Sequence, residues 1–219
     1  ASSANITVKL YQTGSSSAVV NFADTVLPGT SRTYDLGSSS QFAGVANGFL
    51  GSIGVTGDKN LAVQSFVDKV GGAKAVYAFS GLDSASAATT LYAPLVRRAF
   101  AGATTGISIV NPNATAVTVD IQYKYNPASS DLNNYTQSIS IAANSSAVAY
   151  QGTGPMPAGW LGSAVLQSTG PIVAMVNDET SSTSAAYNAP AAADGGKTVS
   201  VPLVRNKQTT AQLTTGVQI

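Results

Sequence analysis

The chain of 219 residues contains no histidine and no cysteine, and Glu179 is its single glutamate. These absences exclude thiolate nucleophiles, Cys-X-X-Cys redox pairs, zinc sites built from Cys or His, and the Ser-His-Asp triad. No paired-carboxylate motif takes their place, and no cluster of Asp supplies the oxygens that Ca²⁺ needs. The sequence therefore indicates a protein that is not an enzyme and that uses no cofactor and no metal.

Charged residues are also scarce. They make up 10% of the chain, with a formal net charge of +1, against a usual share of about 25%. The basic residues are scattered and only Arg97 and Arg98 are adjacent, so the sequence predicts no nucleic-acid partner. Hydrophobic residues reach 44%, which at this low net charge indicates a folded core rather than disorder.

Long apolar runs are missing as well. No stretch approaches the roughly 18 residues that a membrane-spanning helix requires. The first residues, Ala1 to Ala4, are small, like those that remain after a secretory signal is removed. We therefore expect a secreted protein, located outside the cell or on its surface, with no membrane span.

An internal repeat is the strongest positive feature. Residues 48–52 (Gly-Phe-Leu-Gly-Ser) match residues 159–163 (Gly-Trp-Leu-Gly-Ser) at an offset of 111 (159 − 48). Four further blocks match in the same order at offsets of 108 to 111: residues 6–10 with 117–121, 61–63 with 172–174, 94–97 with 202–205, and 104–107 with 214–217. Self-similarity at one period indicates repeated structural units.

Within each repeat, apolar and polar residues alternate. Val117, Val119, Ile121, Tyr123 and Tyr125 are separated by single polar residues, which is typical of a strand with one buried face. No segment has a convincing helical period. The sequence predicts an all-β protein with two tandem Ig-like β-sandwich domains. We expect the first domain over residues 1–97, the second over 98–205, and a terminal strand within 206–219.

The point at which each repeat begins, which we call the phase of the repeat, predicts how these domains assemble. The second repeat starts with a strand at residues 104–110, the first has no counterpart of it, and a copy stands at residues 214–219. We expect the terminal strand of one subunit to complete the first domain of the next by β-augmentation. The residues expected to enter the acceptor are Leu213, Thr215, Gly216, Val217 and Ile219, and those expected to form the acceptor edge are Ile6, Val8 and Leu10.

The length of the join suits a hairpin. Ile109 and Val117 are 8 residues apart (117 − 109). Ile219 and Ile6 of the next subunit would be two residues closer than this if the chain ends met, which still allows a hairpin turn. The predicted organisation resembles that of donor-strand-complemented pilins and surface filaments. The resemblance implies a structural subunit that forms a head-to-tail homopolymer.

Other arrangements share this phase. The terminal strand can fold back onto its own first domain, the chain can be one unit of a longer repeat array, or the match of the last residues can be fortuitous. A different class of function, a surface adhesin or carbohydrate-binding module, would require an exposed aromatic cluster, and the sequence shows none. Trp160 is expected to share a core position with Phe49 rather than to stack on a sugar.

Several surface features are candidate sites of modification. Asn-X-Ser/Thr sequences at Asn113, Asn134 and Asn144 can accept glycans on an extracellular protein, whereas a fourth, at Asn5, begins a predicted strand.

The acidic residues Asp68, Asp178 and Glu179, and the basic residues Arg97 and Arg98, are expected to be solvated loop charges.

Overall fold

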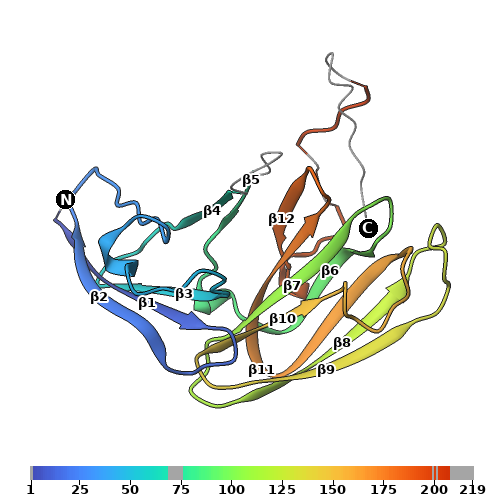
Figure 1. The fold of residues 1–219 in the computed structure, drawn as a ribbon, viewed down its shortest axis with the longest axis horizontal. Coiled ribbons are helices and arrows are strands. Elements are labelled where there is room, and N and C mark those ends of the chain that lie inside the picture. Colours follow the sequence, from blue (N-terminus) through green and yellow to red (C-terminus); the bar gives the residue numbers. More distant parts are fainter. Residues whose placement is uncertain (1, 69–75, 199, 201, 208–219) are drawn as a thin grey trace.

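The computed structural model describes residues 2–68, 76–198, 200 and 202–207. Its regular structure is almost entirely β-strand, which confirms the predicted all-β class (Figure 1). Short 3₁₀ helices lie at Ser40–Phe42, Ser84–Ser86 and Ala192–Asp194. The strands are β1 (Ala4–Gln12), β2 (Ala18–Val26), β3 (Gly51–Gly57), β4 (Gln64–Asp68), β5 (Val76–Ser80), β6 (Ala88–Arg98), β7 (Thr104–Asn111), β8 (Val117–Tyr125), β9 (Tyr135–Ile141), β10 (Ser145–Tyr150), β11 (Trp160–Glu179) and β12 (Ser184–Asn188).

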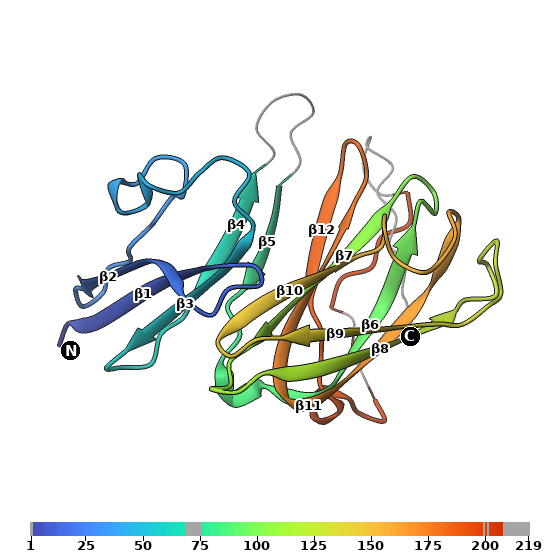
Figure 2. The ribbon, with the colours of Figure 1, turned by 60° about the horizontal axis from the view of Figure 1, so that its bottom comes forward.

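Strand β11 organises the C-terminal unit, β6 to β12, because it belongs to two layers. From Gly162 to Ser168 it pairs with β8, and its other edge there pairs with β6. From Val173 to Glu179 it pairs with β7, and its other edge there pairs with β12. The layers are thus β9-β8-β11-β6 and β10-β7-β11-β12 (Figure 2). Two such layers are consistent with a β-sandwich.

The core of this unit lies between the layers. It contains 19 buried residues, among them Ile121 of β8 and Ile107 of β7. Alternate residues of β8 from Val117 to Tyr123 are buried, as the sequence predicted. The predicted burial of Tyr125 is wrong, because Tyr125 is the last residue of β8, where the strand leaves the core.

Trp160 confirms its predicted place in the core. Its side chain is fully buried and stands edge-on to Tyr123, with ring centroids 6.1 Å apart. The indole Nε1 donates to the backbone oxygen of Asn133 at 3.1 Å, so the buried N–H has an acceptor. Phe49, its repeat counterpart, packs against the core of the N-terminal unit.

The N-terminal unit, β1 to β5, is smaller. It has a three-stranded sheet in the order β2-β1-β3 and a separate hairpin, β4-β5. Its core consists of four buried residues, Ile6, Val8, Leu10 and Phe42. The hairpin lies beside β12 of the other unit (Figure 1). The predicted domain boundary at residues 97 and 98 falls at the end of β6, which pairs with the C-terminal unit; the boundary itself stays a prediction.

The hairpin expected between residues 109 and 117 does not form. β7 pairs with β10 and β11, whereas β8 pairs with β9 and β11. The turn after Asn111 therefore carries the chain from one layer to the other. The Asn111 side chain holds this crossing, because its Nδ2 donates to the backbone oxygens of Thr115 and Ala142, each at 2.9 Å.

A buried ionic network connects the layers elsewhere. Arg97 of β6 donates from Nε to Asp178 Oδ1 of β11 at 3.0 Å, and its second guanidinium nitrogen bonds to Oδ2. Thr105 of β7 donates to Asp178 Oδ1 at 3.1 Å and accepts from the Arg97 backbone N–H at 2.9 Å. The prediction that Arg97 and Asp178 are solvated loop charges is therefore wrong, because both stand on paired strands.

Arg98 was also expected in an exposed loop. It is the last residue of β6 and donates from a guanidinium nitrogen to the backbone oxygens of Gly154 (2.6 Å) and Met156. These bonds hold the loop before β11 against the end of β6. The expectation for Arg98 is therefore wrong as well.

We predict that Asp178→Ala lowers the free energy of unfolding by about 3 kcal/mol, because it leaves the Arg97 charge largely buried without its carboxylate. Asp120→Ala is the matched control, since Asp120 is exposed on β8, and it should change stability by about 0.5 kcal/mol or less. Urea denaturation measures both. Equal denaturation midpoints for the two variants would contradict the prediction.

Candidate functional site

Among the strands of the N-terminal unit, β3 and β4 each have a free edge. β3 pairs with β1 and β4 pairs with β5, and no described strand pairs with the second edge of either. By the repeat, β3 and β4 correspond to the first and second stretches of β11, which are paired on both edges. The free edge of β3 is the one that β6 occupies on β11, and the free edge of β4 is the one that β7 occupies. Free edges offer unpaired backbone groups to a further strand.

Apolar side chains next to these edges are exposed, although their repeat counterparts are buried. Leu61 is 37% exposed and its counterpart Ile172 is 0% exposed. Val63 is 40% exposed and its counterpart Ala174 is 2% exposed. The difference lies in the covering strands, because the C-terminal unit supplies β6 and β7 and the described part of the N-terminal unit has no strand in either place.

Further exposed apolar side chains lie on β3 and β4 themselves. Ile53 is the cross-strand partner of Leu10, which is buried in the core, and cross-strand partners share a face. Val67 is the partner of Tyr77, which stacks with Phe79 at 6.4 Å between ring centroids. We refer to Ile53, Leu61, Val63 and Val67, all exposed, as the open face.

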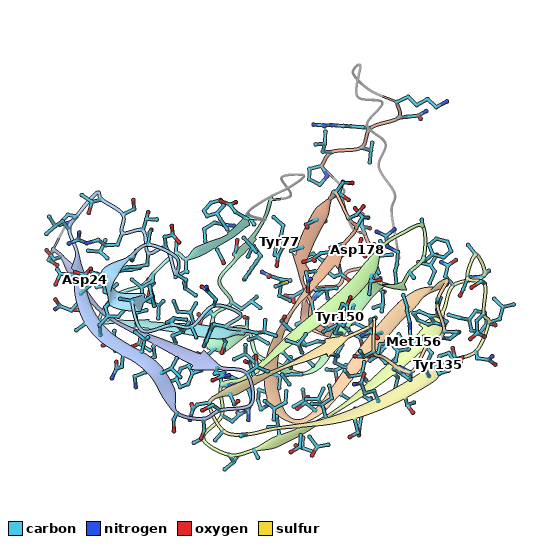
Figure 3. The ribbon with its side chains drawn as sticks, viewed as in Figure 1. Asp24, Tyr77, Tyr135, Tyr150, Met156 and Asp178 are labelled. Atoms are coloured by element: carbon cyan, nitrogen blue, oxygen red, sulfur yellow. The ribbon has the colours of Figure 1, made fainter. Side chains whose placement is uncertain are left out.

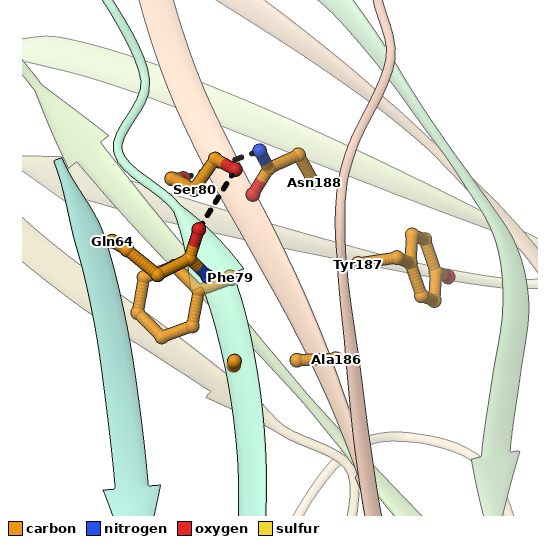
Figure 4. A pocket seen from close by; sticks show the side chains of 7 residues that line it. Gln64, Phe79, Ser80, Ala186, Tyr187 and Asn188 are labelled. Atoms are coloured by element: carbon orange, nitrogen blue, oxygen red, sulfur yellow. Dashed lines mark hydrogen bonds between the residues drawn. The ribbon is translucent and has the colours of Figure 1, made fainter. Parts of the chain in front are cut away.

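The β4-β5 hairpin is held beside the C-terminal unit by polar contacts. Asn188 Nδ2 of β12 donates to the Ser80 backbone oxygen at 3.3 Å, and Ser80 Oγ donates to Gln64 Oε1 at 3.3 Å (Figure 4). Tyr77 lies on the side of the hairpin toward β12 (Figure 3). Burial, and secondarily the negative charge of Glu179, raise the pKa of the Tyr77 hydroxyl. The hairpin thus lies beside β12, although the two belong to separate sheets.

The described start of the C-terminal segment, residues 202–207, carries two exposed apolar side chains. Val204 is 63% exposed, whereas its repeat counterpart Val96 in β6 is 0% exposed. Leu203 is exposed as well. The residues predicted to enter the acceptor, Leu213, Thr215, Gly216, Val217 and Ile219, lie outside the described residues.

The predicted acceptor edge needs a correction. Ile6, Val8 and Leu10 are buried, as their alternation indicated, but β1 is the central strand of its sheet, with β2 on one edge and β3 on the other. Their side chains therefore form the floor of the core and not a free edge. The error follows from the expected hairpin, which would have placed the terminal strand beside β1.

The candidate glycan acceptors lie between strands. Asn134 and Asn144 are exposed, and Asn144 has a left-handed backbone with φ of 51°. Asn113 is half-buried, and its Nδ2 donates to Asn111 Oδ1 at 2.6 Å and to the Pro171 oxygen at 2.7 Å. A glycan at Asn113 would have to displace at least one of these bonds, so Asn134 and Asn144 are the more accessible of the three.

Within residues 2–68, 76–198, 200 and 202–207, no group of three or more Asp and Glu is placed to hold a metal ion. A search of the same residues finds no helix whose length and apolarity would allow it to cross a membrane. The hollow lined by Gln64, Phe79, Ser80 and Tyr187 is shallow and carries no charged side chain (Figure 4).

Comparison with known proteins identifies no family. No family model and no curated protein matches the sequence. One solved structure, described as the crystal structure of Thermotoga maritima 1070, aligns with a TM-score of 0.40 and 12% identity, covering 47% of this chain and 93% of that chain. A similarity of this degree supports no conclusion about function.

We predict that Ile172→Ala and Leu61→Ala differ strongly in cost, although the two residues share a repeat position. Truncating the buried Ile172 should lower the free energy of unfolding by about 2–5 kcal/mol. Truncating the exposed Leu61 should lower it by about 0.5 kcal/mol or less. Denaturant titration in dilute solution measures both, and a large loss for Leu61→Ala would show that another strand covers it in the free chain.

Proposed function

We propose that this chain is the structural subunit of an extracellular filament, in which the C-terminal segment of one copy completes the N-terminal unit of the next. One observation carries the proposal: the open face is apolar and exposed at positions whose repeat counterparts are buried. Burying a Leu, Ile or Val side chain stabilises a contact by about 1.5–3 kcal/mol. Covering the open face is therefore favourable for any strand that fits it.

The terminal residues have the sequence of a strand that fits. In β7, Thr105, Ile107 and Ile109 are buried, and the residue before the strand, Ala103, is buried too. At an offset of 110 (214 − 104) the corresponding residues are Thr215, Val217, Ile219 and Leu213. The buried apolar positions Ala103, Ile107 and Ile109 each keep an apolar residue in the copy. The copy can therefore serve β4 as β7 serves the second stretch of β11.

Such a contact is heterologous, because the donor and the acceptor are different surfaces of the same protein. Heterologous contacts repeat from subunit to subunit and form an open fibre unless their rotation closes a ring. The binding partner is thus an identical copy, and the function is structural, without catalysis and without a cofactor. The location outside the cell is part of the proposal.

The acceptor side is tested by a charge on the open face. Val63→Asp should abolish filaments while the subunit stays folded, since a carboxylate cannot be buried there without a partner. Val19→Asp is the matched control, because Val19 is an exposed valine on β2, away from the open face. Negative-stain microscopy reports filaments and circular dichroism reports folding. Filaments of normal length from folded Val63→Asp would overturn the proposal.

The donor side is tested by deletion of residues 208–219. The truncated chain should remain monomeric, because it keeps the open face but lacks the strand proposed to cover β4. A synthetic peptide of residues 208–219 should block assembly of the intact chain by occupying the same edge, and a peptide of scrambled sequence should not. Light scattering follows both reactions. Assembly of the truncated chain at the normal rate would exclude this segment as the donor.

A further inference from the structure

We infer that the donor consists of two strands, which enter the two layers of the acceptor together. Residues 198–206 add to the free edge of β3 as β6 adds to β11, and residues 214–219 add to β4 as β7 adds to β11. The inference rests on the proposed function and specifies its interface. It is supported by the pairing of β6 with β11. The sequence predicts that β6 is the end of the first domain, yet this strand completes the second.

The first donor strand is identified by its similarity to β6, which extends beyond the block of residues 94–97 that was used to detect the repeat. At an offset of 108 (202 − 94), residues 94–97 of β6 recur at 202–205, and Thr90 also recurs as Thr198. The buried residues of β6 are Leu91, Ala93 and Val96. Their counterparts are Val199, Val201 and Val204, so every buried position of β6 is a β-branched apolar residue in the copy. Val199 and Val201 are compared by sequence alone.

The acceptor edge matches this strand in detail. Gly162 of β11, the partner of Val96, has no room for a side chain: a Cβ there would lie 2.1 Å from the Lys124 backbone oxygen. Gly51 of β3 holds the equivalent place, and a Cβ there would lie 2.0 Å from the Tyr11 backbone oxygen. Because β3 reproduces this close approach to its neighbour, Val204 can lie opposite Gly51 as Val96 lies opposite Gly162.

The register of the second donor strand is indicated by a glycine. In β7, Gly106 lies opposite Asn177, and a Cβ on Gly106 would come within 2.6 Å of Asn177 Oδ1. The counterparts are Gly216 and Phe66, which is 70% exposed. A glycine at this place gives the Phe66 ring room to lie across the donated strand, an aromatic-on-glycine pairing that fixes register in sheets.

The connection between the two donor strands is long enough. In the C-terminal unit, five residues (99–103) link β6 to β7 and carry the chain from one layer to the other. In the donor, seven residues (207–213) separate the two copies. The donor therefore has two more residues than the same crossing requires, so both strands can be in place at once.

One feature of the C-terminal unit is not reproduced. Arg97 and Thr105 have donor counterparts in Arg205 and Thr215, but the residue that corresponds to Asp178 is Val67. The acceptor therefore supplies apolar surface where the C-terminal unit has a carboxylate. The interface we infer is held by backbone hydrogen bonds and apolar burial, and not by a copy of the ionic network.

The absence of cysteine from the chain makes the register testable by disulfide trapping. Arg97 lies opposite Leu161, and Thr105 lies opposite Asp178. The translated pairs are Arg205 with Leu50 for the first donor strand and Thr215 with Val67 for the second. Chains that carry one cysteine each are mixed in pairs, with tags of different size, and oxidised during assembly. A disulfide requires Cα atoms within about 7 Å, and a mixed-tag dimer can form only between subunits.

We expect mixed dimers from Arg205→Cys with Leu50→Cys and from Thr215→Cys with Val67→Cys, and none when Val19→Cys replaces either acceptor. Filaments that trap only the Thr215–Val67 pair would overturn the two-stranded donor and leave the proposed filament intact. Filaments that trap neither pair would overturn the register of both strands. Failure of the intact chain to assemble, together with no mixed dimer, would overturn the proposed function itself.

Discussion

Pairing of β11 along both of its edges is the interaction on which the C-terminal unit depends. This strand of 20 residues is shared by two layers. The four strands that pair with it therefore have their positions in both layers set by the same strand. Every large side chain that β11 directs inward, from Trp160 to Val176, is thereby covered. The ionic network of Arg97, Thr105 and Asp178 then ties β6, β7 and β11 together at one end of this arrangement.

The same sequence pattern without the flanking strands gives a different surface. β3, β4 and the loop between them correspond in the repeat to β11. Ile53 of β3 and the loop residues Leu61 and Val63 are nevertheless exposed, and neither strand has a described neighbour on its second edge. The exposure is not a property of these residue types, since Ile172 and Ala174 are buried at the same repeat positions. It reports the absence of two neighbouring strands in the described residues.

Sequence alone was sufficient for the features that depend on local pattern. The alternation in β8 correctly predicted the burial of Val117, Val119 and Ile121, and the repeat correctly placed Trp160 in the core. It was not sufficient for strand order, because residues that are close in sequence can lie in different layers. The proximity of residues 109 and 117 suggested a hairpin, whereas β7 and β8 lie in separate layers joined by the Asn111 turn. For the same reason β1 was predicted to have a free edge, whereas it lies between β2 and β3.

The ion pair shows a second limit. Arg97 and Asp178 are 81 positions apart, and nothing in their local sequence distinguishes them from solvated charges. Only the antiparallel pairing of β6, β7 and β11 brings them together. The internal repeat, by contrast, relates segments that are far apart in the sequence. It aligns residues 61–63, where Leu61 and Val63 are exposed, with residues 172–174, where Ile172 and Ala174 are buried.

The break between β3 and β4 has a mechanical consequence. In the C-terminal unit one continuous strand spans both layers and therefore sets the distance between them. In the N-terminal unit the corresponding path is interrupted after Gly57, and β4 resumes at Gln64. The three-stranded sheet and the β4-β5 hairpin are joined there by a loop instead of a rigid strand, so no continuous strand sets the distance between them.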